Sequence, residues 1–491
     1  MEVFRFYLFC QKMHCVNRRL LAGVAASAAA YATFPINASL ECSPSTTTTD
    51  DIQVKRAVVI FRHGDRSPIH KPDDHIQPSS TLEEEASFWS SKLPSRDQCL
   101  TWLQSHPISS PTQPRLDSGQ RPWGQLTNVG AEQARQLGLL LRKRLVDREG
   151  LLPITLNAAD IRAHSTSIYR SQVSFFFCHS FVNFLISGIL TLFDSELLFF
   201  SSFSFSLFFP PPLQQTLQNV LLGLYNMDER SKDVSDSRIS INVTSKPEID
   251  EFQYSPDRNK CSHLLKLHQV LTHHSLVMPM LTENEANVLN KMQSLFHYEK
   301  LATTRVRSTL VCLRSHGRSM PDGITAEDVV LLERANSMME YKKYANSDYF
   351  KLALGRLVPR VLDSLKNRKK IKEGGETEEG GEEKEETNQP KLVLFSGHDS
   401  TIKPLTVALG LDQMYDWPKY CANILIEYGE NKKTGEGHVR VLYNQQVKGV
   451  IGLKLDEKGW HSAKDFIQYF EKYGIGDKEH GMYCNELGLR L

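Results

Sequence analysis

The sequence predicts an α/β protein that carries a separate helical cap, and three features of the chain point to this class. The run Ala57–Phe61 reads as a buried strand, and Lys391–Phe395, much further along the chain, reads as another. Each run is followed within a few residues by a histidine with polar neighbours. Residues 246–372 have no alternating strand pattern and read as mostly helical, which indicates the cap.

The length and composition are those of an ordinary globular protein. The chain has 491 residues, of which 40% are hydrophobic and 23% charged, enough for a large core in two or three domains or in one large fold with an insertion. With a formal net charge of +1, the chain lacks the surplus of basic residues that nucleic-acid binding needs, so we expect no nucleic-acid partner. None of the nine cysteines has CxxC spacing, which argues against a zinc ribbon or a dithiol redox motif.

Residues 1–50 read as a targeting segment or an N-terminal anchor. Acidic residues are absent from most of this segment, and an Ala-rich apolar run follows Arg18 and Arg19. This pattern fits a mitochondrial transit segment or a membrane anchor, and it also fits a secretory signal. We expect a mitochondrial or membrane-associated protein, with the secretory pathway as the alternative. The glycosylation sequons at Asn37 and Asn242 matter only for that alternative.

The first strand leads directly into the motif Arg62-His63-Gly64-Asp65-Arg66-Ser67-Pro68. A strand that ends in this way puts an imidazole between two guanidinium groups at the carboxyl edge of a sheet, where ligands bind in α/β proteins. Arginine forms bidentate, charge-assisted bonds to phosphate oxygens, and a neutral imidazole nitrogen can attack phosphorus. The motif therefore predicts a phosphomonoester hydrolase that works through a phosphohistidine.

A helix is predicted after Gly124-Gln125-Leu126-Thr127. Thr127 is a suitable N-cap residue. The apolar residues that follow at helical spacing are Ala134, Leu137, Leu141 and Leu145. Basic residues occupy positions 142–144 in the last turns, as is typical of a helix C-terminus.

Residues 173–214 differ from the rest of the chain and form a Phe-rich insert. The insert consists mainly of Phe, Leu, Ser and Ile and ends in Pro210-Pro211-Pro212 and two further residues. It approaches the length of a membrane span, but it contains polar residues and lacks basic or aromatic flanks. A loop this apolar would need its own burial site. Since Phe, Ser, Leu and Pro have codons made only of pyrimidines, we interpret the insert as translated intron sequence, with a genuine insertion or a membrane span as alternatives.

Removal of the insert restores a helical pattern. When Gln172 is joined to Gln215, the apolar residues of the joined segment fall on one face of a helix. These residues are Ile168, Leu217, Leu221 and Leu224. The insert interrupts this stripe.

The remaining parts of the chain are assigned from composition and pattern. The α/β catalytic domain comprises residues 53–172, 215–245 and 390–460, and residues 461–491 form a C-terminal segment. Residues 373–389 are rich in Gly and Glu and are expected to be a disordered loop. Two more strands are predicted at Ala422–Tyr428 and His438–Tyr443.

Together these motifs resemble the histidine acid phosphatase family, the phosphatase branch of the phosphoglycerate-mutase-like fold. The matching pieces are Arg62-His63-Gly64-x-Arg66-x-Pro68, Gly124-Gln125-Leu126-Thr127-x-x-Gly130, His398-Asp399, and Trp417-Pro418 with Glu427-Tyr428. Within the family, the segment 165–170 joined to 221–224 looks most like the lysophosphatidic acid phosphatases. The resemblance implies helices around a mainly parallel sheet, plus a helical cap domain.

The resemblance also implies a role for each residue of the site. His63 is the nucleophile, while Arg62 and Arg66 bind the non-bridging phosphate oxygens. His398 is a further phosphate donor from the opposite wall. Asp399 protonates the leaving alcohol and then activates water, which favours an acidic pH optimum.

The chain departs from the family pattern at one phosphate ligand. The family has an arginine directly before its Ser/Thr-Thr pair, six residues ahead of a second arginine. Here His164 holds that place, six residues before Arg170, and the nearest arginine is Arg162. Either Arg162 reaches the phosphate through a small local shift, or His164 replaces the arginine with a weaker, pH-dependent charge.

The leading interpretation is an acid phosphatase for a small phosphomonoester, with lysophosphatidic acid as the candidate substrate. A phytase or phosphosugar phosphatase is the alternative within the fold. A catalytically impaired or non-catalytic product is the alternative from another class, because the insert breaks the helix that carries Arg170. Arginines supply the positive charge, so we expect no metal and no cofactor. Membrane association is expected through the N-terminus.

Overall fold

The computed structural model of the chain describes residues 51–69, 81–95, 97–99, 108–109, 122–155, 157–165, 212–225, 241–244, 261–296, 303–366, 389–411 and 415–486. Three expectations from the sequence lie outside these residues. They concern the targeting segment, nearly all of the Glu/Gly-rich loop, and the Phe-rich insert up to its last three residues.

The strands of the described residues form one mixed sheet, in the order β2-β4-β3-β5-β1-β6-β7-β8, with β9 paired to β7. Their bounds are β1 (Ile52–Arg62), β2 (Ile108–Ser109), β3 (Ile161–Ser165), β4 (Ile241–Thr244), β5 (Leu392–Gly397), β6 (Asn423–Asn431), β7 (Gly437–Tyr443), β8 (Gln446–Lys448) and β9 (His461–Ser462). The central strands β1 and β5 are rich in Val, Leu and Ile and are buried on both faces, as is typical of parallel strands under helices.

The sheet has a parallel half and an antiparallel half. Neighbouring strands from β2 to β1 are parallel, whereas β1, β6, β7 and β8 pair antiparallel. The α/β fold class is confirmed, but the sheet is mainly parallel only on the β2-to-β1 side. The antiparallel half follows from the chain connections, because β6, β7 and β8 follow one another through short turns, which only antiparallel strands allow.

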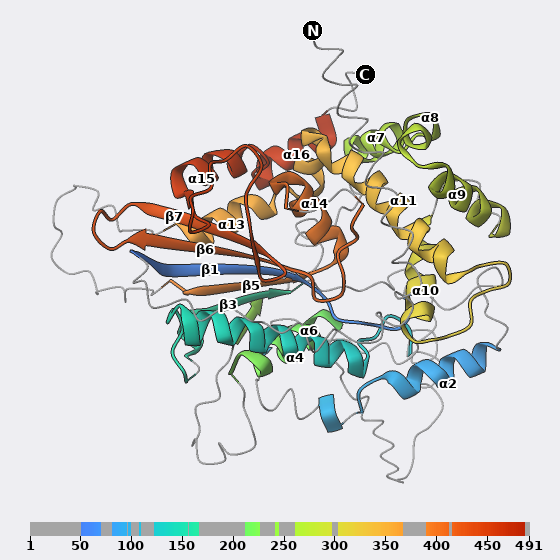
Figure 1. Cartoon of the computed structure of the whole chain (residues 1–491), viewed down its shortest axis with the longest axis horizontal. Helices are drawn as coiled ribbons and strands as arrows, with labels where there is room; N and C mark the ends of the chain where they lie inside the picture. Colours follow the sequence, from blue (N-terminus) through green and yellow to red (C-terminus); the bar gives the residue numbers. More distant parts are fainter. Residues whose placement is uncertain are drawn as a thin grey trace, which may run out of the picture.

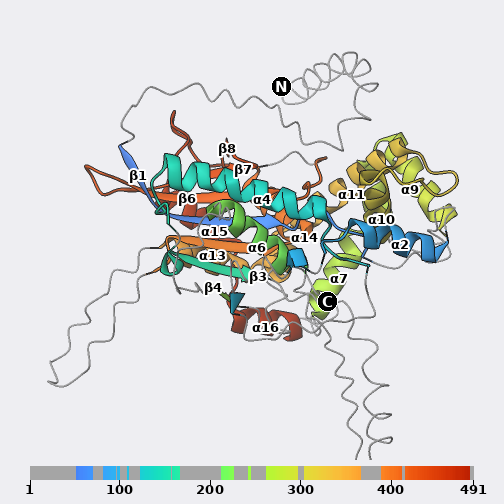
Figure 2. The ribbon, with the colours of Figure 1, turned by 90° about the horizontal axis from the view of Figure 1, so that it is seen from below.

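Helices cover both faces of the sheet (Figures 1 and 2): α4 and α6 lie on one face, and α12 to α15 on the other. The helix bounds are α2 (Leu82–Lys92), α4 (Asn128–Arg142), α6 (Pro212–Tyr225), α7 (Ser262–Leu271), α8 (His274–Val277), α9 (Glu283–Leu295), α10 (Thr303–Ser315), α11 (Ala326–Ala345), α12 (Ser347–Leu354), α13 (Leu357–Leu365), α14 (Asp399–Leu409), α15 (Ala463–Glu471) and α16 (Asp477–Glu486), with the π-helix η2 (Lys143–Arg148) and the short 3-10 turns η3 (Ala158–Asp160) and η7 (Met278–Met280). Within the described part of the chain, no helix has the length and apolar character that a membrane crossing requires.

Helices α4 and α6 form a close pair under the sheet. Thr127 caps α4 as the sequence predicts, its Oγ1 accepting a hydrogen bond from the Gly130 amide at 3.1 Å. A Cβ on Gly138 of α4 or on Gly223 of α6 would lie 2.0 Å from a carbonyl oxygen of the other helix. Glycine at both positions therefore allows the two backbones to approach. The predicted apolar stripe beyond the insert is the buried face of α6.

A second, smaller core lies between α2 and the helices α8 to α11, at the right of Figure 1. Trp89 of α2 is fully buried in it, beside residues of α9, α10 and α11. Within residues 246–372, α7, α12 and α13 pack on the sheet core instead. The cap helices are thus α2 and α8 to α11.

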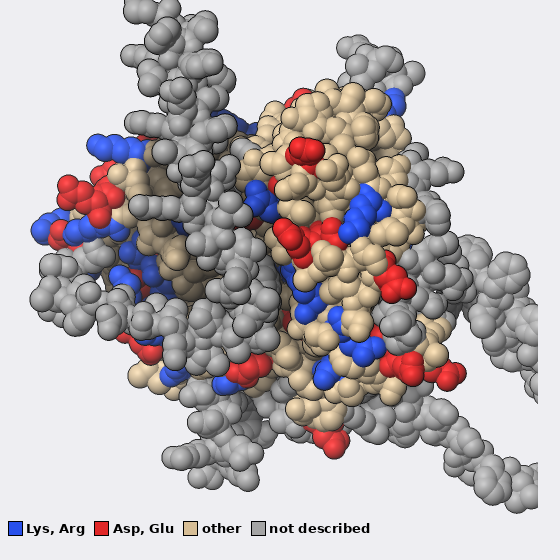
Figure 3. Space-filling view, turned by 45° about the vertical axis from the view of Figure 1, so that its right-hand side comes forward, with Lys and Arg blue, Asp and Glu red and all other residues tan. Residues whose placement is uncertain are grey.

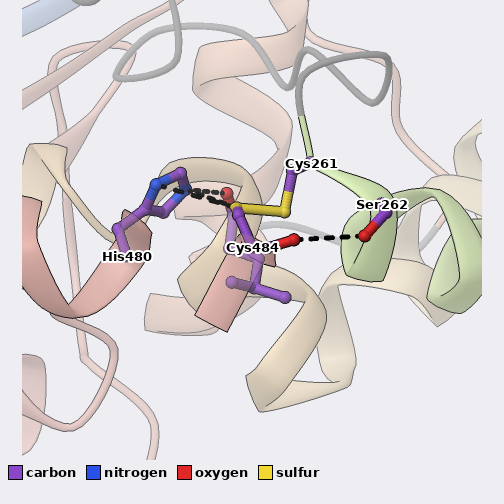
Figure 4. The surroundings of a disulfide bond; sticks show 5 residues. Cys261, Ser262, His480 and Cys484 are labelled. Carbon is purple, nitrogen blue, oxygen red and sulfur yellow. Dashed lines mark hydrogen bonds between the residues drawn. A yellow bond between two sulfur atoms is a disulfide. The ribbon is translucent and has the colours of Figure 1, made fainter. Parts of the chain in front are cut away.

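Residues 461–486 pack against the main core. Phe466 and Phe470 of α15 are fully buried there, and β9 extends the sheet beside β7. A disulfide between Cys261 and Cys484 joins the start of α7 to α16 (Figure 4). This bond ties the C-terminal helix to the middle of the chain.

The charged residues on the face shown in Figure 3 are mixed in sign. Lysines and arginines alternate there with aspartates and glutamates.

Candidate active site

Two strand-end loops meet at the carboxyl edge of the parallel strands. β1 and β5 are parallel neighbours, with Arg62 opposite Gly397. The next residue on each strand is a histidine, and the ring centroids of His63 and His398 lie 5.7 Å apart. The fold therefore brings together two motifs that are separated by most of the chain.

His63 is held in one tautomer. Its Nδ1 lies 2.8 Å from the Gly64 carbonyl oxygen. Because a carbonyl oxygen only accepts, Nδ1 carries the proton and Nε2 has the free lone pair. The backbone of His63 is fixed as well, since its amide donates to the Gly397 carbonyl at 3.1 Å and its carbonyl accepts from the Cys421 amide at 3.2 Å.

The imidazole of His63 is neutral well into the acid range. Burial lowers its pKa well below the ordinary value, and the positive charges of Arg62 and Arg66 lower the pKa further. His398 acts in the same direction. The site therefore presents an unprotonated nitrogen, the form that can attack phosphorus.

Asp399, the first residue of α14, receives three donors on one oxygen. Its Oδ2 lies 3.2 Å from Nη2 of Arg62 and 3.4 Å from Nη2 of Arg307, and it accepts a hydrogen bond from Nε1 of Trp417 at 3.3 Å. Burial raises the pKa of this carboxyl, but the charges of Arg62 and Arg307 outweigh burial and hold the pKa well below its usual range. Asp399 is therefore ionised when no substrate is bound.

Arg66 and Asp65 point to different neighbours. Arg66 is buried, and its Nη2 donates to Ser308 Oγ of α10 at 3.0 Å. The Asp65 carboxylate accepts from Thr127 Oγ1 at 2.5 Å and from His316 Nε2 at 2.7 Å. These three contacts join the loop of His63 to the N-cap of α4, to the cap helix α10 and to the residue that follows α10.

The motifs around His63 and Thr127 form one packed unit. A Cβ on Gly64 would lie 2.2 Å from the Gly130 carbonyl oxygen, and a Cβ on Gly130 would lie 2.1 Å from the Asp65 carbonyl oxygen. The Thr127 amide also donates to the Asp65 carbonyl at 3.0 Å. The glycines of both motifs are thus explained by a close approach of backbone to backbone.

The structure does not bring Arg162 or His164 to this cluster. Both lie in β3, where Arg162 is opposite Val393 and His164 is opposite Phe395. A strand advances about 3.3 Å per residue, so both positions precede the carboxyl edge at which His398 follows β5.

The surroundings of these two residues also argue against the expected role. Arg162 is exposed, whereas the His164 ring stacks on Phe395 with centroids 4.9 Å apart. Burial lowers the pKa of His164 to about 4, assisted by Arg360 and Arg162, so the ring carries no charge near neutral pH. The third phosphate ligand is therefore neither Arg162 nor His164, which corrects the interpretation from the sequence. Arg170 lies outside the described residues.

Sequence reasoning missed Arg307, Tyr420 and His316. The guanidinium carbon of Arg307 lies 3.6 Å from the ring centroid of Trp417, and that of Arg62 lies 4.4 Å from the ring centroid of Tyr420. A weak signal existed for Arg307, because helical periodicity places it beside the buried stripe of α10, next to Val306.

A family model supports the assignment that this geometry suggests. The model of the histidine phosphatase superfamily (branch 2) matches residues 53–174 and 213–444. The chain belongs to the histidine phosphatase superfamily, branch 2. The protein is accordingly a phosphatase. The two matched stretches leave out residues 175–212, nearly the whole of the Phe-rich insert.

Curated relatives of this phosphatase are distant but cover most of it. Lysophosphatidic acid phosphatase type 6 of Bos taurus is 22% identical over 475 residues, covering 89% of this chain and 87% of the relative. Counting factor 60 of Dictyostelium discoideum is 22% identical over 409 residues, covering 78% of each protein.

Solved structures with the same fold include two phytases. The phytase of Klebsiella sp. ASR1 has a TM-score of 0.51 at 12% identity, covering 86% of this chain and 96% of its own. The phytase of Citrobacter braakii has a TM-score of 0.50 at 12% identity, covering 87% and 99%. At this identity the likeness concerns the fold alone.

Proposed function

We propose that this phosphatase hydrolyses phosphomonoesters through a phosphohistidine formed on His63. The observation that carries the proposal is the state of His63. The imidazole is buried and neutral, with its proton on Nδ1 and its lone pair on Nε2. Arg62 and Arg66 flank it in the sequence and provide donors for the phosphate oxygens, and His398 lies across from it.

The reaction proceeds in two steps. In the first, a substrate monoanion passes its proton to the Asp399 carboxylate. Nε2 of His63 bonds to phosphorus, the ester P–O bond breaks, and the Asp399 carboxyl gives that proton to the leaving alkoxide. In the second, the Asp399 carboxylate takes a proton from water, the oxygen attacks phosphorus, and the P–N bond breaks. Inorganic phosphate leaves, and His63 returns to its neutral form.

Substitution of the nucleophile tests this mechanism. His63→Ala removes the attacking nitrogen, so turnover of p-nitrophenyl phosphate should fall by several orders of magnitude. Asp399→Asn should slow the second step and accumulate acid-labile phosphohistidine, which a rapid-quench assay with labelled substrate detects. His438→Ala, on the antiparallel strand β7, is the control and should keep full activity. An active His63→Ala variant would refute the proposal.

We further propose lysophosphatidic acid as a substrate, with monoacylglycerol as the product. The support is the coverage of the relative from Bos taurus along nearly the whole chain and the likeness of residues 165–170 and 221–224 to the lysophosphatidic acid phosphatases. A panel of lysophosphatidic acid, phytate and sugar phosphates tests the proposal. The highest kcat/KM should belong to the lysophospholipid, and a preference for phytate or a sugar phosphate would assign the substrate class differently.

The insert 173–214 is proposed to be translated intron sequence. The gap in the family match at 175–212 supports this, as does the buried apolar face of α6 directly after the insert. Sequencing of the mature transcript across Gln172 and Gln215 tests it. If the codons are translated, we expect low activity and poor solubility, as in the non-catalytic alternative; a soluble, fully active chain that contains them would contradict this expectation.

For the compartment, the disulfide between Cys261 and Cys484 favours the secretory pathway over the mitochondrial or membrane-associated alternative, because disulfides persist in oxidising compartments. Cell fractionation tests this, together with an endoglycosidase-dependent mass shift from the sequons at Asn37 and Asn242.

A further inference from the structure

We propose that Arg307, from the cap helix α10, is the third guanidinium that binds the substrate phosphate, and that Trp417 holds it in place. The inference rests on the proposed function and deepens it. It assigns the phosphate ligand that neither Arg162 nor His164 supplies. The ligand then comes from the cap and not from the sheet.

The position of Arg307 is the first argument. The residue is 4% exposed, and its Nη2 lies 3.4 Å from Oδ2 of Asp399. Nη2 of Arg62 lies 3.2 Å from the same oxygen. One guanidinium from strand β1 and one from the cap helix α10 therefore converge on the carboxylate that would face the leaving group.

The second argument is that both guanidiniums have a donor without an acceptor. Nε of Arg62 and Nε of Arg307 are buried, and neither has a hydrogen-bond partner. A buried donor that stays unsatisfied is costly. A phosphate has enough oxygen atoms to accept from both arginines at once, and a guanidinium binds such oxygens in a bidentate manner.

The third argument is charge. Arg62, Arg66 and Arg307 carry three positive charges. The carboxylates of Asp399 and Asp65 carry two negative charges, and that of Asp65 also accepts from Thr127 and His316. The cluster therefore has a surplus of positive charge. A phosphate dianion is the complement to that surplus.

Trp417 orients Arg307 through a fixed loop. The Arg307 guanidinium carbon lies 3.6 Å from the Trp417 ring centroid, a cation–π contact that restricts the side chain. The neighbouring Asp416 carbonyl accepts from Lys403 Nζ and from Ser337 Oγ, both at 2.7 Å. The loop is thus held from two helices, α14 and α11, and Trp417 is a positioning residue.

A phosphate-binding measurement tests the proposal without relying on turnover. Arg307→Ala should weaken the binding of inorganic phosphate about 10- to 100-fold by titration calorimetry, the usual effect of losing a charge-assisted hydrogen bond. Arg305→Ala, an exposed arginine on the same helix, is the control and should bind like the wild type. Trp417→Leu should weaken binding by a smaller factor, and Trp417→Phe, which keeps a ring under the guanidinium, should restore most of it.

Two further readouts separate binding from folding. Arg307→Met keeps the length of the side chain and replaces Arg307→Ala if the latter does not fold. Millimolar guanidinium ion should recover part of the phosphate binding of Arg307→Ala, which a purely structural role for Arg307 would not allow. With p-nitrophenyl phosphate, KM should rise in the Arg307 variants and not in Arg305→Ala.

Each outcome has a distinct meaning. If the Arg307 variants bind phosphate as tightly as Arg305→Ala, the inference is wrong. If the wild type binds no phosphate, the inference is also wrong. If the wild type binds phosphate through Arg307 but does not turn over a phosphomonoester, the anion site is supported and the proposed function fails.

Discussion

In the proposed mechanism, the ionisation of Asp399 determines how a proton reaches the leaving group. Without substrate, the charges of Arg62 and Arg307 overcome the effect of burial and keep the pKa of this carboxyl well below its usual range. A phosphate monoester that enters as a monoanion brings a proton with it. Once its oxygens engage the guanidiniums, the pKa of Asp399 rises and the carboxyl can accept that proton. The proton for the leaving group thus comes from the substrate itself.

This argument predicts the pH dependence of kcat/KM. The second pKa of a phosphate monoester is about 6, so kcat/KM should fall tenfold per pH unit above that value as the monoanion disappears. The acid limb belongs to His63, whose pKa is far below 6.5 because of burial, Arg62 and Arg66; activity should therefore persist well below pH 6. Steady-state kinetics from pH 3 to pH 9 measure both limbs. A maximum above neutrality would contradict these roles.

At this site, the sequence could predict features that depend on neighbouring residues in the chain, but not contacts between residues far apart in the sequence. His63 and His398 were identified because each follows a local strand pattern. Arg307 was not identified, because the helical periodicity of α10 shows that one face is buried but not that Arg307 contacts the distant carboxylate of Asp399. His164 was misassigned because a motif match carries no information about register, and the pairing with Phe395 places it before the sheet edge.

At the level of secondary-structure elements, a buried ion cluster joins β6, β7 and η2. Glu427 of β6 is fully buried and accepts from Arg144 Nε at 2.5 Å and from Arg440 Nε at 2.7 Å. Burial raises the pKa of Glu427, but hydrogen bonding and charge from Arg144 and Arg440 lower it below the ordinary value. The sequence indicated Glu427 only as part of a family motif, since its partners are distant in the chain.

Removal of this carboxylate should destabilise the sheet. In Glu427→Gln, Glu149 remains beside Arg144 and Arg440 at 3.7 and 2.6 Å, so two buried guanidinium charges share one carboxylate. The substitution should lower the free energy of unfolding by about 3–5 kcal/mol. Because the folded pKa is depressed, the carboxylate stabilises the protein above its unfolded pKa of about 4.3 and loses this effect as pH falls through the folded pKa. Urea denaturation at pH 7 and at pH 3 measures both effects.

A surface pair provides the matched control. Glu132 and Arg135 on α4 lie 2.8 Å apart and are largely exposed, so Glu132→Gln should cost no more than about 1 kcal/mol. Equal costs for the two substitutions would mean that burial of the Glu427 cluster has no energetic role.

At the level of the whole molecule, the disulfide between Cys261 and Cys484 links residues 223 positions apart. Closing so long a loop restricts the unfolded chain, so Cys484→Ala should lower the free energy of unfolding by about 2–4 kcal/mol. Thermal unfolding with and without a reductant measures this. Reductant should lower the Tm of the wild type and leave that of Cys484→Ala unchanged, and an unaffected wild type would contradict a stabilising disulfide.

The adjacency of β1 and β5 has a consequence for biosynthesis. Arg62 and Gly397 are paired neighbours, yet a ribosome completes β1 long before it reaches β5. A nascent or prematurely terminated polypeptide that lacks β5 and Asp399 therefore holds the proposed nucleophile without its proposed acid, and we expect it to have no hydrolytic capacity.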